Sequence, residues 1–365
     1  MNKLKEISSN RKWKGRWIWD QDEGDIENSF YYFRKEFEIT DSKTEVNLYL
    51  TADTRYQLYL NGEYIGEGPV QSQPYFKYYD IRNMGTHLET GKNCLALIVN
   101  YTGTIPDTRG GLLAELVTET GEIIVKTDET WKVKRAEAWR EETFKTWYNN
   151  VTTHQEFFDS RKVPEGWKEG GFDDNNWNQT KILEGRYSDR PPAVHPWTHL
   201  LARDIPYMEK RDVYPEKIEK AEEALDIANR WRSEDLSIVL STTGKPVKYS
   251  TIKDVNNLIK KEETTIIQNS TEHQDKVFDG IYDPCILLDF GRVITGYIEL
   301  DLKGVEGGIV DIGYTERLID GEFNNAIEGQ FADRYIMKDG RQKFRSFTWK
   351  GFRYVKLRFH SCFEP

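Results

Sequence analysis

Hydrophobic and polar residues alternate in the segment RYQLYL at 55–60, which is followed by Asn61-Gly62 and a second apolar stretch. Alternate side chains of an extended chain point to opposite sides, so Leu58 and Leu60 share one face. Asn-Gly supplies the two residues with positive φ that a type I′ turn requires. The pattern therefore predicts a β-hairpin with one buried face.

Similar strand patterns, separated by turns that are often marked by glycine, extend across residues 30–135 and return over residues 285–365. Short strands with frequent turns and no long helical pattern are typical of a sandwich or jelly roll. We therefore predict a mainly β chain with two β-sandwich domains. The first covers residues 12–210, a connector covers 211–284, and the second covers 285–365.

The connector carries a different pattern. The segment PEKIEKAEEALDIANRWR begins at Pro215 and has apolar residues at 218, 221, 225 and 228. Proline in the first turn and apolar residues at this spacing predict a helix at 215–232. Residues 253–263 are predicted to form a second short helix. The partly helical connector is assigned either to a linker or to the second domain.

Charge and cysteine content narrow the class of protein. The net charge is −10 and both signs are mixed along the chain, so no basic stripe is available to neutralise the phosphates of a nucleic acid. The N-terminal segment lacks the apolar core of a signal peptide, and no apolar run is long enough to cross a membrane. Three widely spaced cysteines indicate reduced thiols. We therefore predict a cytoplasmic protein with neither a nucleic-acid nor a membrane partner.

Two short motifs lack the surroundings that their chemistry would need. Asp-Phe-Gly at 289–291 matches the metal-binding tripeptide of protein kinases, but the glycine-rich loop, strand lysine and His-Arg-Asp loop of that class are missing. Asp289 is instead expected on the outer side of a strand. His195 and His199 have the spacing of a helical zinc site, but Pro196 prevents a regular helix there.

Two polar segments carry candidate site residues. In HQEFFDSR, His154, Glu156 and Asp159 lie close together in the chain. Such side chains on a loop can hold calcium or contact sugar hydroxyls, and the alternative is a half-exposed strand with solvated charges. In FDDNNW at 172–177, the two aspartates are predicted to cap a turn through Asx hydrogen bonds while the tryptophan anchors it in the core.

Several segments, in order along most of the chain, resemble those of a known family. They are RWIW at 16–19, YFRKEFEI at 32–39, ADTRYQLYLNGEYIGEGP at 52–69, LETGKNCLALIV at 88–99, FFDSRKVPEGW at 157–167, FDDNNW at 172–177, ARDIPYMEK at 202–210, LDFGRVITGYIELDLKG at 288–304, YTERL at 314–318 and WKGFRYVKLRF at 349–359. The series resembles the N-terminal half of bacterial α-L-rhamnosidases of glycoside hydrolase family 78.

This resemblance implies a galactose-binding-like N-terminal sandwich followed by a concanavalin-like sandwich. Members of the family continue into an (α/α)6 barrel, which holds the acid and the base of an inverting hydrolysis. The present chain stops at the point where that barrel is expected to begin. The resemblance therefore assigns no catalytic residue to it, and it leaves open whether the chain is a fragment of a longer enzyme or a separate accessory protein.

The resemblance also points to a sugar site. Some sandwiches of the family bind rhamnose with the help of calcium, through acidic and amide side chains of a loop. The nearest match is Asp159, with Asn149 and Asn150 upstream, and Trp147 or Trp167 would stack on the apolar face of a deoxysugar. Calcium is the only cofactor that the resemblance allows.

Two functions follow from these observations. In the first, the chain is the non-catalytic N-terminal region of an α-L-rhamnosidase-like hydrolase, and it supports or orients a rhamnoside for a catalytic barrel of the same or a partner chain. The alternative is a stand-alone carbohydrate-binding or structural β-sandwich protein without turnover. The expected ligands are rhamnose-containing glycans or glycosides, and whether the chain itself is an enzyme stays open.

Overall fold

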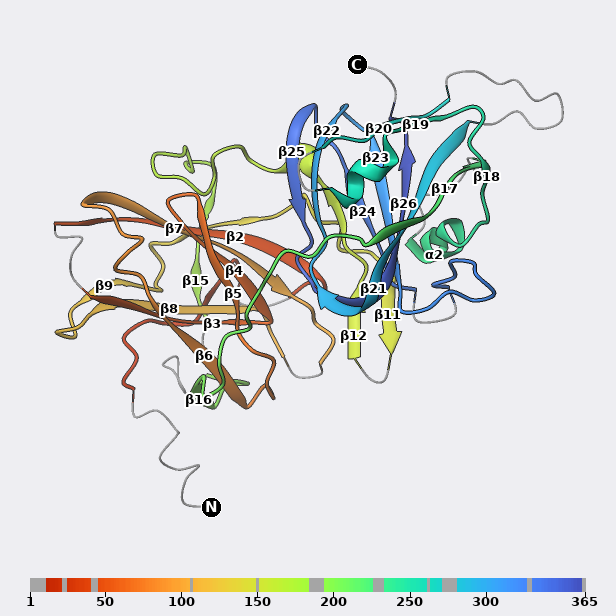
Figure 1. Cartoon of the computed structure of the whole chain (residues 1–365). Helices are drawn as coiled ribbons and strands as arrows, with labels where there is room; N and C mark the ends of the chain where they lie inside the picture. Colours follow the sequence, from red (N-terminus) through yellow and green to blue (C-terminus); the bar gives the residue numbers. More distant parts are fainter. Residues whose placement is uncertain are drawn as a thin grey trace. The chain divides into compact units, whose positions relative to one another are not determined.

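The computed structural model describes residues 11–21, 25–40, 45–105, 108–148, 151–183, 194–225, 233–260, 263–270, 281–326 and 330–362. The chain forms two compact units, shown in Figure 1. Unit 1 consists of Met1–Glu137 and Pro164–Met208, and unit 2 of Ala138–Val163 and Glu209–Pro365. Both are built mainly of strands, as the sequence predicted.

Unit 1 is a sandwich of two sheets. The first has the order β15 (Lys181–Ile182), β1 (Ile18–Trp19), β8 (Gly111–Thr118), β3 (Val46–Asp53), β6 (Phe76–Asn83) and β16 (His199–Ala202), with β9 (Ile123–Lys126) paired to β8. The second has the order β14 (Asn178–Gln179), β10 (Lys132–Arg135), β2 (Ser29–Ile39), β7 (Gly91–Tyr101), β4 (Arg55–Leu60) and β5 (Glu63–Gly68). Side chains of both sheets, such as Leu50 and Leu97, share one buried core.

The hairpin that the sequence predicted is formed by β4 and β5. Asn61 has φ 50° and Gly62 has φ 84°, so both turn residues have the positive φ that a two-residue type I′ turn requires. Leu58 and Leu60 are buried in the core of unit 1. The turn and the burial of this face are therefore confirmed, but Gln57 and Tyr59 on the opposite face are buried as well, so β4 does not have only one buried face.

Arg34 on β2 holds the turn that contains the FDDNNW motif. Its buried guanidinium donates to the carbonyl oxygens of Trp167, Glu169 and Phe172 at 3.2, 2.7 and 3.2 Å. It also forms an ion pair with Asp174. Within the motif, the Asn175 amide donates to Asp173 Oδ1 at 3.1 Å and the Trp177 side chain is buried. The predicted Asx turn is thus confirmed for Asp173, whereas the Asp174 carboxylate pairs with Arg34 instead of capping the turn.

Unit 2 is organised around a seven-stranded sheet. Its order is β13 (Phe157–Asp159), β24 (Ala332–Ile336), β23 (Ile309–Thr315), β26 (Lys350–His360), β21 (Tyr282–Gly296), β17 (Lys217–Leu225) and β18 (Lys245–Pro246). Three two-stranded sheets accompany it: β22 (Glu299–Gly304) with β25 (Gly340–Arg345), β19 (Thr251–Lys253) with β20 (Ile266–Gln268), and β11 (Lys145–Tyr148) with β12 (Val151–His154).

Different elements pack on the two faces of this seven-stranded sheet. On one face, Ile286, Val310 and Leu357 form a core with side chains of β25 and of the β19–β20 pair. On the other face, the short helix α2 (Leu236–Leu240) packs Leu236 and Leu240 against the sheet. Asp289 lies on the face opposite the core, as expected, but it is buried and bonded to Arg353 rather than solvated.

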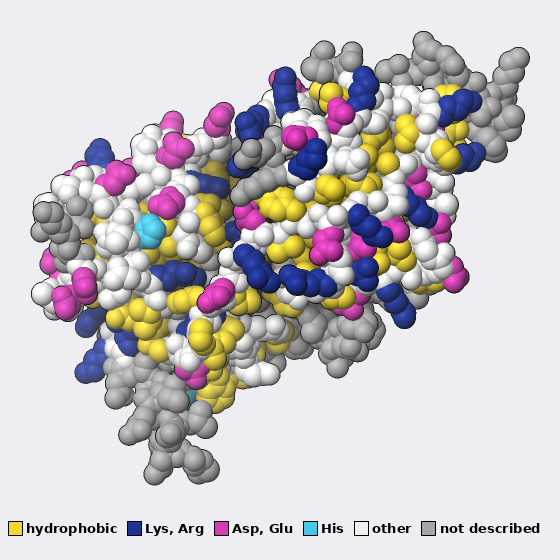
Figure 2. Space-filling view, in the orientation of Figure 1, with side chains coloured by type: hydrophobic (Ala, Val, Ile, Leu, Met, Phe, Trp, Pro, Cys, Tyr) yellow, Lys and Arg dark blue, Asp and Glu magenta, His cyan; other side chains and the backbone are white. Residues whose placement is uncertain are grey.

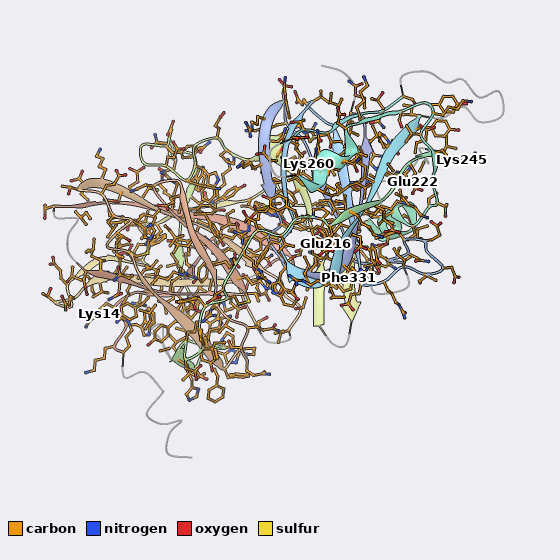
Figure 3. All side chains as sticks on the ribbon, in the orientation of Figure 1. Lys14, Glu216, Glu222, Lys245, Lys260 and Phe331 are labelled. Carbon is orange, nitrogen blue, oxygen red and sulfur yellow. The ribbon has the colours of Figure 1, made fainter. Side chains whose placement is uncertain are left out.

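The prediction of a helix at 215–232 is wrong over its first half, because Lys217–Leu225 form the strand β17. Two acids explain why a segment rich in helix formers is extended. Glu222 is buried, and its Oε1 lies 2.9 Å from Lys356 Nζ. Glu223 Oε2 accepts a hydrogen bond from the Ser250 amide at 2.8 Å. These partners exist only in the folded sheet, where tertiary contacts override helix propensity. Figure 3 shows Glu222 near Lys245, which belongs to the adjacent strand β18.

The rest of the predicted connector also differs from expectation. Residues 226–232 lie outside the described part of the chain. The second predicted helix is reduced to the 3-10 helix η3 (Val255–Ile259). The described residues of the connector therefore pack within unit 2 as strands and short helical turns.

The sequence suggested one boundary near residue 210, but the chain passes between the two units three times, after residues 137, 163 and 208. Residues 138–163 leave unit 1 and pack in unit 2, where β13 pairs in parallel with β24. A parallel pairing between segments so far apart in sequence leaves no local signal, so the sequence could not predict it. This excursion carries most of the residues that were predicted to form a site.

Candidate functional site

The structure places only part of the predicted calcium and sugar loop. Asn149 and Asn150 lie outside the described residues. Trp147 belongs to β11, where its backbone pairs with Thr152. Asp159 ends β13 in unit 2, whereas Trp167 belongs to unit 1. The grouping of these five residues into one site therefore stays a prediction.

The Asp159 carboxylate is held by Arg161. Arg161 Nε donates to Oδ1 at 2.9 Å, Nη2 donates to Oδ2 at 2.8 Å, and the Arg161 amide donates to Oδ1 at 3.1 Å. Burial acts to raise the pKa of Asp159, but the bonds to Arg161 outweigh it and lower the pKa. A calcium ion at this carboxylate would have to displace a bidentate guanidinium.

Trp167 serves as a core side chain of unit 1. It is 2% exposed, and its ring centroid lies 4.5 Å from that of Tyr32 and 5.9 Å from that of Tyr59. Trp177 also packs on it. The ring is thus used for packing in this conformation, while the sugar-stacking role of the tryptophans stays a prediction.

The strongest polar arrangement of the predicted HQEFFDSR segment is centred on Glu156. Its carboxylate accepts hydrogen bonds from the Phe347 amide at 2.8 and 3.0 Å and from Trp139 Nε1 at 3.0 Å. Its own amide donates to Asp333 Oδ1 at 2.8 Å. The segment is extended here, as the alternative reading proposed, but Glu156 is buried instead of solvated.

Asp333 completes the arrangement. Its Oδ2 accepts a hydrogen bond from the Tyr314 hydroxyl at 2.9 Å and lies 3.2 Å from Lys350 Nζ. Burial first, and the neighbouring Asp333 carboxylate second, raise the pKa of Glu156 to about 7. A carboxyl group with such a pKa can hold or release a proton near neutral pH. The carboxyl group is enclosed and bonded to Trp139 and to the Phe347 amide. A change in its protonation is therefore expected to affect how this part of unit 2 packs.

A second buried network lies on the face of the sheet that α2 covers. Both ring nitrogens of His360 lie 2.7 Å from carboxylate oxygens, Nδ1 from Asp283 and Nε2 from Asp311. Arg334 donates to both oxygens of Asp311 at 2.6 and 2.8 Å. Arg358 donates to Asp283 Oδ2 at 2.9 and 3.0 Å. A ring placed between two carboxylates donates from both nitrogens when it is doubly protonated.

Groups of opposite charge meet in this network inside unit 2. Burial acts to raise the pKa of Asp311, but Arg334 and His360 outweigh it and hold the pKa far below its usual range. Arg358 also donates to the carbonyl oxygens of Val239 in α2 and Leu225 in β17, at 3.0 and 2.8 Å. The network therefore ties the helix and the strand to the sheet.

Sequence reasoning named Glu156 but not its partners, and it missed the His360 network entirely. The signal for the His360 network was the alternation in FRYVKLRFH, where Lys356, Arg358 and His360 share one face of β26. Alternating charges usually indicate a solvated face. Asp283 and Asp311 on the neighbouring strands pair with Arg358 and His360. These aspartates indicate that the charged face of β26 is covered and not solvated.

Other features of the described part of the chain concern metal binding, membrane spans, cysteines and surface charge. None of its His, Cys, Asp and Glu side chains form a group of three or more that could hold a metal ion. No helix in it is long and apolar enough to span a membrane. All three cysteines are buried and unlinked by disulfides. On the face that Figure 2 shows, basic and acidic side chains are interspersed.

Family models match both parts of the chain. The alpha-L-rhamnosidase N-terminal domain matches residues 41–193, and the bacterial alpha-L-rhamnosidase concanavalin-like domain matches residues 281–361. A curated alpha-L-rhamnosidase of Formosa agariphila is 21% identical over 363 residues, which cover 90% of this chain and 30% of that protein.

Solved structures share the fold. A GH78 family rhamnosidase of Bacillus sp. GL1 aligns with a TM-score of 0.74 at 20% identity, over 98% of this chain and 54% of that one. The alpha-L-rhamnosidase of Dictyoglomus thermophilum aligns with a TM-score of 0.59 at 19% identity, over 97% of this chain and 34% of that one. The chain thus spans about a third to a half of the length of these relatives. It carries the N-terminal and concanavalin-like β domains that form the N-terminal part of bacterial α-L-rhamnosidases of glycoside hydrolase family 78.

Proposed function

We propose that this chain is the non-catalytic N-terminal region of an α-L-rhamnosidase-like glycoside hydrolase. In this role its two β units support or orient a rhamnoside substrate for a catalytic barrel of the same or a partner chain. The observation that carries the proposal is the match of residues 41–193 and 281–361, in that order, to the two rhamnosidase β domains.

The chemistry of the buried acids supports a role without turnover. An inverting glycosidase needs two carboxyl groups about 6.5–9.5 Å apart that face one glycosidic bond and a water molecule. Glu156 is instead held by the Phe347 amide and Trp139, and Asp311 by Arg334 and His360. These acids are already bonded within unit 2 and are used to hold its fold.

Calorimetric titration of the full chain with L-rhamnose, in calcium and again in excess chelator, tests the support of substrate. Saturating heat at millimolar sugar is expected if a β unit contacts the substrate. Heat that disappears with chelator, and with Asp159→Asn, would assign the calcium loop. The matched control is Asp301→Asn, which changes an exposed aspartate that is also paired with an arginine in the same unit.

The absence of heat at millimolar sugar would contradict the substrate-orienting role and favour the structural alternative. Sugar binding by itself does not separate an accessory region from a stand-alone carbohydrate-binding protein. The reading frame beyond residue 365 narrows this choice. Continuation into a series of paired helices supports the accessory role within one chain, whereas a stop codon leaves a barrel on a partner chain or the stand-alone role.

A further inference from the structure

Lys168 of unit 1 has an unusual environment for a lysine. It follows Trp167 in the turn at 165–171 and is half-buried. Its Nζ lies 3.8 Å from the ring centroid of Tyr59 and 5.6 Å from that of Trp167. The turn itself is fixed, because Arg34 bonds to two of its carbonyl oxygens and the Lys168 carbonyl accepts the Gly62 amide at 3.0 Å.

The amine has aromatic neighbours but no acidic partner. Among the residues that the structure describes, no carboxylate forms an ion pair with Lys168, and its interactions are with the two rings. Other half-buried lysines differ in this respect, since Lys220 is paired with Glu322. A cation–π contact with an aromatic ring offsets only part of the desolvation of an ammonium.

Burial without an acidic partner favours the neutral amine. Desolvation lowers the pKa of Lys168 to about 8. An ordinary lysine is about 0.1% neutral at pH 7.5, whereas an amine with this pKa is about a quarter neutral. Lower basicity also makes the nitrogen a weaker nucleophile. With the dependence of nucleophilicity on pKa that thiols show, the larger neutral fraction still gives Lys168 a rate about tenfold above that of an ordinary lysine. Lysines desolvated in apolar surroundings are the type that reacts covalently.

We propose that Lys168 is a preferred site of N-acylation by small acyl donors of the thioester and acyl phosphate classes. In this step the neutral Nζ attacks the acyl carbon and an N–C amide bond forms. The C–S or C–O bond to the leaving group breaks, and the leaving group keeps that electron pair. The nitrogen gives one proton to solvent. The product has no charge over the Tyr59 ring.

Acetyl phosphate is the probe that tests the proposal on the full chain. The protein is treated at pH 7.5, and acetylated peptides are followed over time by mass spectrometry. We expect Lys168 to be acetylated about tenfold faster than Lys220, which is of similar exposure, and than the exposed Lys181. The Lys168→Arg variant confirms the assignment of the modified peptide.

The pH dependence gives a second readout. The rate at Lys168 is expected to level off above about pH 9, whereas an ordinary lysine amine continues to gain reactivity up to about pH 10 and beyond. A rate at Lys168 that is equal to or below that of the two reference lysines at pH 7.5, including no reaction, overturns the proposal. So does a rate that rises in parallel with theirs through pH 10.

Discussion

Replacing Glu156 by glutamine removes a carboxyl group whose proton binding makes the free energy of unfolding depend on pH. The side chain is buried between the Phe347 amide, Trp139 and the Asp333 carboxylate. Burial and Asp333 raise its pKa from 4.5 to about 7. Glu156 lies in the segment 138–163, which belongs to unit 2. Its protonation is therefore coupled to the stability of that unit.

The sign follows from the direction of this shift. Below pH 4.5, Glu156 is protonated in both the folded and the unfolded chain, and protonation stabilises the fold fully. Between pH 4.5 and about 7, the unfolded chain loses this proton while the folded chain keeps it, so the free energy of unfolding falls as pH rises. Each pKa unit corresponds to about 1.4 kcal/mol, which gives a loss of about 3 kcal/mol by pH 8.

Glu156→Gln cannot titrate and should lack this loss. The stability of the variant relative to the wild type should therefore rise by about 3 kcal/mol between pH 4.5 and pH 8. Urea unfolding at each pH measures it. Pulse hydrogen exchange at one fixed labelling pH then reports peptides of β23 and β26, so that unit 2 is followed separately from unit 1.

Glu306→Gln is the matched control, because Glu306 is an exposed acid of the same unit. Its stability should run parallel to that of the wild type over the whole range. Parallel curves for Glu156→Gln as well would show that the carboxyl group does not keep its proton inside the fold, and would refute the reasoning.

Three further predictions concern stability. Asp311→Asn should lower the free energy of unfolding of unit 2 by about 3 kcal/mol or more, because Arg334 and His360 lose their shared carboxylate; unchanged urea midpoints in β23 peptides would contradict it. Gly62→Ala should cost unit 1 about 1 kcal/mol in urea unfolding, since φ is 84°, and a neutral effect would argue against the type I′ turn. Arg34→Lys should cost about 2 kcal/mol and speed amide exchange at 164–177, because a compact ammonium with three donors cannot replace the planar fork that reaches three carbonyls and Asp174; unaltered exchange there would count against this role.

Local turn chemistry and strand alternation predicted much of the fold. Asn61-Gly62 specifies a turn by its own backbone preferences, and the alternation around it specifies which face is buried. The Asx turn at Asp173 is equally local, since donor and acceptor are two residues apart. The family resemblance then gave the order of the two β domains.

The failures of prediction have a common physical cause, which is that the deciding partner lies far away in sequence. Pro215 and the apolar spacing that follows it suggested a helix, because the sheet partners of Glu222 and Glu223, Lys356 and Ser250, cannot be assigned from one strand. Glu156 was taken as a loop or half-exposed residue because Asp333 lies 177 residues further along the chain. Buried charge pairs are recognised only when both strands are known.

Hydrolysis of a chromogenic aryl α-L-rhamnoside by the purified full chain is the decisive assay for a role without turnover. No release of the aryl alcohol above the buffer rate is expected at any pH between 4.5 and 8. Turnover that remains with the protein through successive purification steps, and that is lost in Glu156→Gln but kept in Glu306→Gln, would place catalytic acids in this chain and exclude a non-catalytic role.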